Sequence, residues 1–333
     1  LYIACRYGHI EIVKLLLNDQ RVDINKANEI DCTPFSIACA LGHIEIVKLL
    51  LNDERTDVNK GDDEGWTPFS VVCRHGRIEI VKLLLNDERI DVNKATLSAE
   101  TPFYDVDKAG NYGQTPLHAA CEKGHIEIVK LLLNDQRVDI NKADMYGRAP
   151  LYIACEKGHI EIVKLLLNDE RTNINKADMY GRAPFSITCS NGHLEIVKLL
   201  LNDNIVDINK PNNRGDTPFS TACLFGHIEI VKLLLNDQRV DVDKANEYDK
   251  TPFWFACEKG HIEIVEYLIA SGKELKMKKK RRRQTAIDIA RKRGNEEKGF
   301  WEPEQGFQKR DCSKIIELLE SFERNPIETR FKL

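Results

Sequence analysis

Hydrophobic and polar positions recur along this chain in blocks of constant length, with one block every thirty-four positions. The block from Thr33 to Lys60 reads TPFSIACALGHIEIVKLLLNDERTDVNK. Thr33 followed by Pro34 is typical of a helix start, because the hydroxyl caps free amides and proline already has helical backbone angles. Gly42 suits a helix end, because glycine easily adopts the left-handed conformation. The block therefore predicts a short helix, a turn, and a second helix from about Ile44.

The second helix of each block is apolar on several sides. Its apolar positions in this block are Ile44, Ile46, Val47, Leu49, Leu50 and Leu51, a set wider than one face of a helix. Only Glu45 and Lys48 look exposed, and their spacing of three lets them pair. The polar DERTDVNK segment that follows predicts an extended connector. A helix with this pattern needs more than one neighbour, so the blocks are expected to stack end to end.

The phrase GHIEIVKLLLND marks the successive repeats. It begins unchanged at Gly8, Gly42, Gly124, Gly158 and Gly226, with near copies at Gly76, Gly192 and Gly260. Two places depart from the period. Phe103 and Leu117 are only fourteen positions apart instead of thirty-four, which indicates a repeat that has lost twenty positions and its second helix. Ile264 and Ile315 are too far apart by seventeen positions, which indicates an insertion in the last repeat.

The shortened repeat leaves two arrangements open. Between about Asn86 and Pro116 there is almost no helical pattern, and so long a connection is unusual in a compact stack. The stack could break there and hinge. Alternatively, the repeat beginning at Thr115 could dock directly onto the one beginning at Thr67, with residues 94–114 extruded as an oversized finger. We favour docking, because a break would expose two matching apolar faces at ~25 cal/mol per Å².

The chain resembles the ankyrin repeat family. The resemblance rests on TPLHAACEKGHIEIV at 115–129, on the repeated D-[VI]-N after the second helix, and on tandem copies over nearly the whole chain. It implies an all-α repeat solenoid of helix–turn–helix repeats with β-hairpin or finger loops. About nine to ten repeats are expected, one truncated and the last with an insertion. NDER or NDQR makes each unit one position longer than is usual in the family, and the glycine that usually caps the second helix appears only at Gly272.

These features divide the chain into four predicted segments. Residues 1–100 form a first block of ankyrin repeats whose N-terminal repeat is incomplete, and 101–114 form the truncated repeat or long finger loop. Residues 115–271 form a second block, and 272–333 hold a basic finger and a capping repeat with the seventeen-position insertion. Ala149 and Ala183 replace the capping threonine in consecutive repeats. We expect those two helix starts to be weak, because a missing cap costs ~1 kcal/mol.

Composition indicates an intracellular protein. No stretch of the 333 residues approaches the ~20 apolar residues that span a bilayer. Eight of the ten cysteines share one register of the repeat, too far apart to pair, which predicts free thiols in a reducing cytoplasmic or nuclear setting. Residues 1–271 carry 31 Lys+Arg against 42 Asp+Glu, and residues 272–333 carry 18 against 11. The first residue, Leu1, indicates a fragment or a clipped chain.

The sequence carries no catalytic signature. It lacks G-x-x-x-x-G-K-[ST], H-E-x-x-H and G-x-S-x-G, so we expect no enzyme, cofactor, metal or small-molecule substrate. Seven of the nine histidines follow the glycine between the two helices. We expect each to hydrogen-bond local backbone, since copies in successive repeats stand too far apart to share an ion.

The family's usual binding surface is the concave side, built from finger tips and first helices. These positions also differ between the repeats of this chain, whereas the second helix hardly changes. Tyr, Trp and Arg are typical interface anchors, although such variation also arises where packing tolerates it. The candidate partner-binding residues are Trp66, Arg74, Tyr112, Lys123, Tyr146, Arg148, Lys157, Tyr180, Arg182, Phe225, Tyr248 and Trp254.

A basic run, KMKKKRRR, falls on the last finger. Its charged residues are Lys276, Lys278, Lys279, Lys280, Arg281, Arg282 and Arg283. A nuclear-import signal, a solvated loop, and a contact with nucleic acid or acidic lipid all remain open. No aromatic residue interleaves with the run, which disfavours nucleic acid.

The leading interpretation is a non-enzymatic scaffold or adaptor, monomeric, that binds a protein partner on the concave helix and finger surface. One alternative is a nuclear factor that uses residues 276–283 to contact nucleic acid. Another is the interaction region of a larger enzyme whose catalytic domain lies outside this chain.

Overall fold

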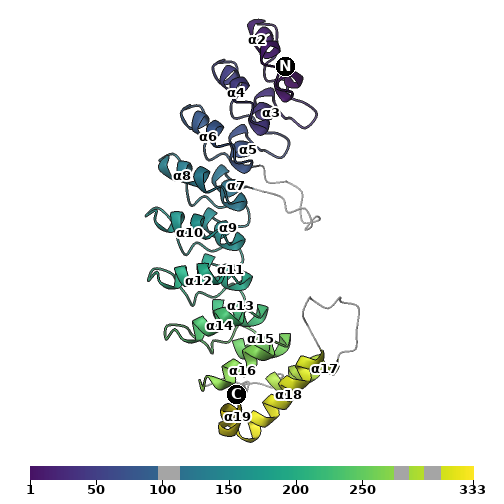
Figure 1. Ribbon diagram of the computed structural model, residues 1–333, viewed down its shortest axis with the longest axis vertical. Helices are drawn as coiled ribbons and strands as arrows, with labels where there is room; N and C mark the ends of the chain where they lie inside the picture. The colour runs from purple at the N-terminus through teal and green to yellow at the C-terminus, as the bar shows by residue number, and fades with distance from the viewer. Residues whose placement is uncertain (97–112, 274–284, 296–308) are drawn as a thin grey trace. The chain divides into compact units, whose positions relative to one another are not determined.

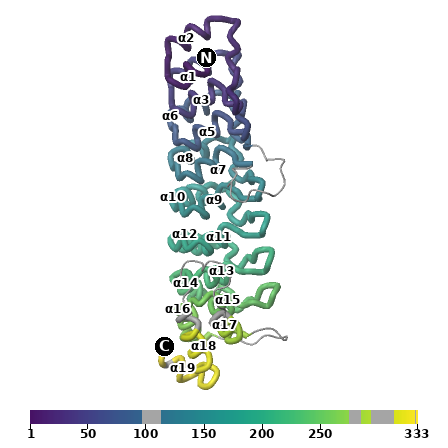
Figure 2. The backbone as a smooth tube through the Cα atoms, turned by 90° about the vertical axis from the view of Figure 1, so that its right-hand side faces the viewer, coloured from purple at the N-terminus to yellow at the C-terminus, as the bar shows by residue number. Residues whose placement is uncertain are grey.

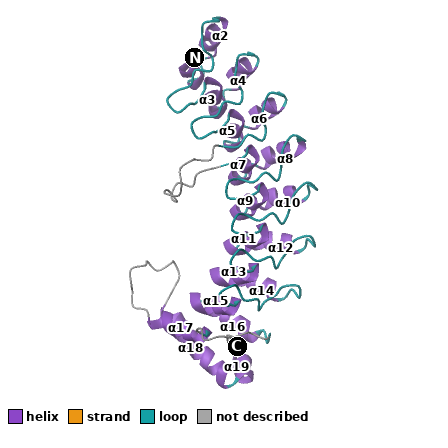
Figure 3. Cartoon of the chain, turned by 180° about the vertical axis from the view of Figure 1, so that it is seen from behind, coloured by secondary structure: helices purple, strands orange, loops and turns teal. Residues whose placement is uncertain are grey.

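The computed structural model describes residues 1–96, 113–273, 285–295 and 309–333. Every regular element in these ranges is an α-helix (Figure 3). The described helices form two compact units, Leu1–Met179 (the N-terminal unit) and Tyr180–Leu333 (the C-terminal unit). None of them is long and apolar enough to cross a membrane.

The helices come in pairs, one pair per repeat (Figure 1). The N-terminal unit contains α1 (Tyr2–Arg6) with α2 (Ile10–Asn18), α3 (Pro34–Leu41) with α4 (Ile44–Leu51), α5 (Pro68–Arg74) with α6 (Ile78–Leu85), α7 (Pro116–Lys123) with α8 (Ile126–Asn134), and α9 (Pro150–Lys157) with α10 (Ile160–Leu167). The C-terminal unit contains α11 (Pro184–Asn191) with α12 (Leu194–Leu201), α13 (Pro218–Phe225) with α14 (Ile228–Leu235), α15 (Pro252–Lys259) with α16 (Ile262–Ala270), α17 (Ala286–Asn295) with α18 (Lys309–Arg324), and then α19 (Pro326–Lys332).

Within each unit the first helices of successive pairs pack in one layer and the second helices in a second layer (Figures 1 and 2). The finger loops that join one pair to the next run beside the first helices. This is the stacked arrangement of helix–turn–helix repeats that the sequence predicts.

The predicted helix boundaries are confirmed, and their causes are local. Thr33 Oγ1 accepts a hydrogen bond from Ser36 N at 3.0 Å, and Pro34 occupies the first helical position. Gly42 ends the helix with φ +84°, in the left-handed region. On the second helix Lys48 and Glu45 pair at 2.8 Å, as their spacing indicates.

The core lies between the two helix layers. Ile46, Val47 and Leu50 on α4 are buried, and so is Phe35 on α3. The eight cysteines of the common register are buried thiols that form no disulfide. Burial raises the pKa of the Cys5 thiol to about 12, so it stays protonated and acts as a small apolar side chain.

The repeats on either side of residues 94–114 dock directly, so the favoured arrangement is confirmed. The α5 helix packs on α7, and α6 packs on α8. His125 Nε2 donates to Arg74 O at 3.0 Å, and Arg137 Nη2 donates to Leu85 O at 2.7 Å. No break in the stack separates these two repeats, and Leu84 of α6 is buried.

The connection between these repeats has the base of an ordinary finger. Thr96 N donates to Gln114 O at 3.0 Å, and Gln114 N donates back to Thr96 Oγ1 at 3.0 Å. In an ordinary finger the matching bond joins residues four apart, as from Asp144 N to Arg148 O at 2.9 Å. Thr96 and Gln114 are eighteen positions apart, so the finger is longer by fourteen. The TPFY segment that suggested a truncated repeat lies outside the described residues.

The C-terminal helices close the stack of the C-terminal unit. Ile315, Leu319 and Phe322 of α18 are buried. The α18 helix packs on α16 and α17. The repeat pattern does not predict α19, whose Arg330 donates through Nε to Ile269 O at 3.2 Å. The insertion in the last repeat falls largely in residues 296–308, outside the described residues.

Candidate partner-binding surface

Each finger tip is a turn held by one acceptor side chain. Asp144 Oδ1 accepts from Tyr146 N and Arg148 N, both at 2.9 Å. Gly147 then adopts φ +78°, and a Cβ there would lie 2.8 Å from Met179 N of the next finger. The tips are therefore fixed, and the residue before the glycine projects from a defined position.

Adjacent fingers are also joined to each other through their backbones. Met179 N donates to Tyr146 O at 2.8 Å in the N-terminal unit, and Asp63 N donates to Ile30 O at 3.2 Å. In the C-terminal unit Asn213 N donates to Tyr180 O at 2.9 Å. Side chains at the same position of successive tips are thus held in register.

The repeated histidines connect successive repeats. His43 Nε2 donates to Arg6 O at 3.2 Å, and His227 Nε2 donates to Ser190 O at 2.8 Å. Each acceptor lies near the end of the preceding repeat's first helix. The prediction that these rings bond local backbone is therefore wrong, because stacking brings a free helix-end carbonyl of the previous repeat closer. Arg77 replaces histidine once and donates to Ala40 O at 3.2 Å.

The arginine of NDER and NDQR caps the second helix of the preceding repeat. Arg89 Nη2 donates to Leu51 O, and Arg239 Nη2 donates to Leu201 O at 2.8 Å. These carbonyls have no partner inside their own helix, and a cation suits the negative end of the helix dipole. This contact explains how the second helices end without the glycine usual in the family. Arg89 also holds the pKa of the Asp87 carboxyl below its ordinary value through hydrogen bonds.

The asparagine of D-[VI]-N joins successive fingers. Asn59 Nδ2 donates to Arg89 O, and its Oδ1 accepts from Asp91 N at 2.8 Å. Asn93 makes the same pair of contacts with Arg137 O and Asp139 N across the long finger. The repeated histidine, arginine and asparagine therefore join neighbouring repeats to each other.

The two candidate tryptophans are buried. Trp66 is 6% exposed and packs with Val71 and Ala119, while the Arg74 guanidinium stacks 4.8 Å from the Trp66 ring centroid. Trp254 is also 6% exposed, with Lys250 Nζ 3.8 Å from its ring centroid. Sequence register places both on the variable surface but does not show that the rings fold inward.

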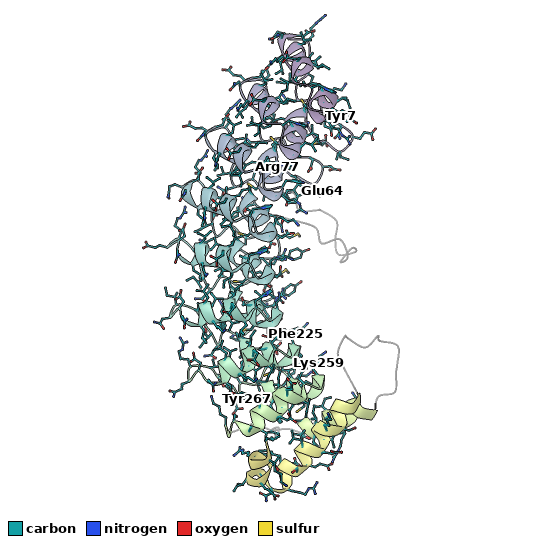
Figure 4. The ribbon with its side chains drawn as sticks, in the orientation of Figure 1. Tyr7, Glu64, Arg77, Phe225, Lys259 and Tyr267 are labelled. Atoms are coloured by element: carbon teal, nitrogen blue, oxygen red, sulfur yellow. The ribbon has the colours of Figure 1, made fainter. Side chains whose placement is uncertain are left out.

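Several other candidates are exposed. Tyr180, Phe225 and Tyr248 each expose more than half of their surface. In the C-terminal unit Phe225 and Lys259 lie on the first-helix side, whereas Tyr267 lies on the second-helix side (Figure 4). Arg182 stacks on Tyr180 with its guanidinium carbon 5.2 Å from the ring centroid.

The remaining described candidates are engaged by neighbouring side chains. Arg148 stacks on Tyr146 at 5.0 Å and donates to the buried Asp144 carboxylate at 2.8 Å. Lys123 pairs with Glu122 at 3.0 Å, and Lys157 lies 3.9 Å from Glu156. Tyr112 and the basic run Lys276, Lys278–Arg283 lie outside the described residues.

Ile30, Met145, Met179 and Arg214 are exposed tip residues that the sequence-based set does not include. Ile30 is exposed and occupies the same turn position as Glu64, Tyr146 and Tyr180. Its register, one full repeat before Glu64, identifies it. In the parts of the chain that the structure describes, no group of three or more His, Cys, Asp or Glu side chains is arranged to hold a metal ion.

Comparison with known families agrees with the architecture. A model described as ankyrin repeats (3 copies) matches residues 1–96, 97–178 and 170–246, and a single ankyrin-repeat model matches residues 248–279. A comparison with curated proteins returns no match.

Proposed function

Because the chain belongs to the ankyrin-repeat family, we propose that it is a non-enzymatic adaptor that binds a partner protein on its finger face. We define the finger face as the surface made by the finger tips and the ends of the first helices. Ankyrin repeats are in general protein–protein interaction modules. The proposal depends on one observation. The polar residues that recur from repeat to repeat hydrogen-bond to neighbouring repeats, whereas variable residues at the finger tips are exposed to solvent.

The exposed aromatic side chains support this assignment. Tyr180, Phe225 and Tyr248 gain little from folding where they lie, because more than half of each remains in water. Large rings with a polar edge anchor interfaces at a low cost in conformational entropy. The second-helix face offers instead Glu–Lys pairs such as Glu195–Lys198, which are well solvated.

Affinity capture with matched variants tests the proposal. The finger-face variant carries Tyr180→Ala and Tyr248→Ala, and the control carries Glu195→Gln and Lys198→Gln on the second-helix face. We expect proteins captured by the wild type to be lost with the finger-face variant and kept with the control. Equal capture by both variants would contradict binding through the finger face.

We also propose that the protein works in the cytoplasm or the nucleus, where its free thiols stay reduced. The basic run is the basis of a second and less favoured candidate function, contact with nucleic acid in the nucleus. A fluorescent fusion in which Lys278–Arg283 are replaced by alanine tests the import signal. If the run is an import signal, the wild-type fusion is nuclear and the alanine variant is excluded from the nucleus. Nucleic-acid binding would show affinity that falls steeply with salt.

A further inference from the structure

We propose that the tip row of the C-terminal unit, Tyr180, Arg214 and Tyr248, binds an extended acidic segment of a partner protein. In this arrangement a carboxylate of the segment pairs with Arg214, and apolar side chains on either side of it pack on the two tyrosine rings. The proposal rests on the proposed adaptor function and specifies the chemistry of the partner.

The three tips form one continuous row. Tyr180 O accepts from Asn213 N at 2.9 Å, and Arg214 O accepts from Glu247 N at 3.0 Å. Because these bonds join equivalent positions of successive fingers, Tyr180, Arg214 and Tyr248 occupy the same place in three consecutive turns. Their side chains therefore line one edge of the C-terminal unit.

The backbone of the row is held by hydrogen bonds in the unbound protein. Asn212 Oδ1 accepts from Arg214 N at 2.9 Å, and Asn246 Oδ1 accepts from Tyr248 N at 2.9 Å. Asn246 Nδ2 also donates to the buried Asp216 carboxylate at 2.7 Å, which links the second and third fingers. Binding to a surface held in this way loses little conformational entropy, which favours affinity.

The chemistry of the row matches a carboxylate between apolar groups. Tyr180 is 52% exposed and Tyr248 is 53% exposed. Arg214 is exposed between them, and its guanidinium makes no hydrogen bond or ion pair within the described part of the chain. An arginine fork available in this way suits bidentate pairing with a carboxylate.

Neighbouring charges give the bound segment a direction. Arg182 lies at the Tyr180 end of the row, stacked on that ring. Glu247 and Asp249 are exposed on either side of Tyr248. A second acidic residue of the partner is therefore favoured on the Tyr180 side of Arg214 and disfavoured on the Tyr248 side.

The dimensions of the stack set the spacing of the anchors. Neighbouring packed helices, and so neighbouring fingers, lie ~8–10 Å apart. An extended chain advances ~3.3 Å per residue. The partner segment should therefore place its acidic residue about three residues from each apolar anchor. Phe225, 54% exposed at the end of the helix that follows the Arg214 finger, offers further apolar surface on the first-helix side of the same unit (Figure 4).

Selection from a displayed library of random peptides tests the proposal on the full chain. The wild type should enrich peptides with an acidic residue flanked about three positions away by apolar or aromatic residues. Arg214→Gln should lose the acidic preference, and Arg214→Lys should retain it in part. Lys198→Gln, which removes one positive charge from the second-helix face of the same unit, should enrich the same peptides as the wild type.

Affinities of one enriched peptide then give the magnitudes. We expect Arg214→Gln to weaken binding up to about fivefold, as for an exposed ion pair, and Tyr248→Ala to weaken it about tenfold. The proposal is overturned by enrichment without acidic residues, by the same enrichment on Arg214→Gln, or by no enrichment at all. Each of these results leaves the capture experiment to decide separately whether the finger face binds a folded protein.

Discussion

At the residue scale, one position of the first helix carries side chains of very different length from repeat to repeat, and the long ones contact the next finger. Four repeats have serine there, including Ser36 and Ser70. Tyr152 at this position donates to Asp178 at 3.2 Å. His118 receives a hydrogen bond from Thr115 N at 3.1 Å on Nδ1 and donates to Arg148 O at 2.9 Å through Nε2. The ring therefore has a fixed neutral form in a buried site.

Acid should destabilise the protein through His118. Burial lowers the pKa of this imidazole from 6.5 to about 4. Between pH 6.5 and about 4, His118 is protonated in the unfolded chain but stays neutral in the folded protein. The free energy of unfolding is therefore unaffected by His118 above pH 6.5 and decreases as the pH falls toward 4. We expect up to ~1.4 kcal/mol per pH unit from one such group. Denaturant unfolding of wild type and His118→Ser across this range should show a shallower dependence for the variant; equal slopes would exclude His118 as the cause.

The two missing helix caps make a second prediction at this scale. Ala149 and Ala183 have the extended backbone of a capping residue but no side-chain bond to their helices. Threonine is buried without strain at this position in other repeats, as at Thr33. We expect Ala149→Thr and Ala183→Thr each to stabilise the protein by ~1 kcal/mol. Ala149→Val supplies the matched shape without a hydroxyl, and a melting temperature raised equally by valine would contradict capping.

At the element scale, six second helices (α2, α4, α6, α8, α12 and α14) are each capped by a basic side chain of the repeat that follows. Arg89 and Arg137 donate to the terminal carbonyls of α4 and α6, and they also pair with their own aspartates at 2.6 Å. Lys273 makes the equivalent contact with Leu235 O of α14 at 2.5 Å. Arg21 has the same sequence context, yet its side chain is 90% exposed and pairs with Asp19. Capping of one helix is therefore a property of two adjacent repeats.

This contrast allows a prediction with an internal control. Arg89→Ala and Arg137→Ala should each lower the free energy of unfolding by about 1 kcal/mol, because each leaves a helix-end carbonyl without its charged donor. Arg21→Ala should change it very little. Melting temperatures of the three variants measure the difference, about 2–4 °C for a unit of this size. A loss for Arg21→Ala as large as for Arg137→Ala would refute the inter-repeat cap.

The sequence predicts contacts between residues close together in the chain, but it does not predict the side-chain contacts between repeats. Helix starts and ends follow from residues a few positions apart, such as Thr33 with Ser36, so the pattern of the chain is sufficient. The contacts of His43 and Arg89 join residues more than a full repeat apart, and only the stacked structure pairs them. The candidate surface was located by register, whereas the burial of Trp66 depends on packing against Ala119 across the long finger.

At the scale of the whole molecule, the long finger shows whether extra residues in one connection disturb the packing of the repeats on either side. The docked helices α5 and α7, and the contacts of Asn93 with Arg137 and Asp139, are those of an ordinary junction. The added residues therefore leave the pairing of repeats intact. Stability in such a stack is roughly a sum of repeat and neighbour terms, so the insertion should act mainly through the entropy of loop closure.

Removing the insertion should therefore leave the N-terminal unit folded and slightly more stable. Deleting residues 97–110 joins Thr96 to Asn111 and leaves Asn-Tyr-Gly before Gln114, which matches the spacing of the other fingers. Shortening the loop from eighteen positions to four should recover roughly 1 kcal/mol of closure entropy. Thr96→Val, which removes the acceptor of Gln114 N, should by contrast destabilise the finger base of the full-length chain. Urea unfolding measures the free energy of unfolding of the wild type and the two variants. A deletion variant that is much less stable than the wild type would show that residues 97–110 contribute to the docking of α7 on α5.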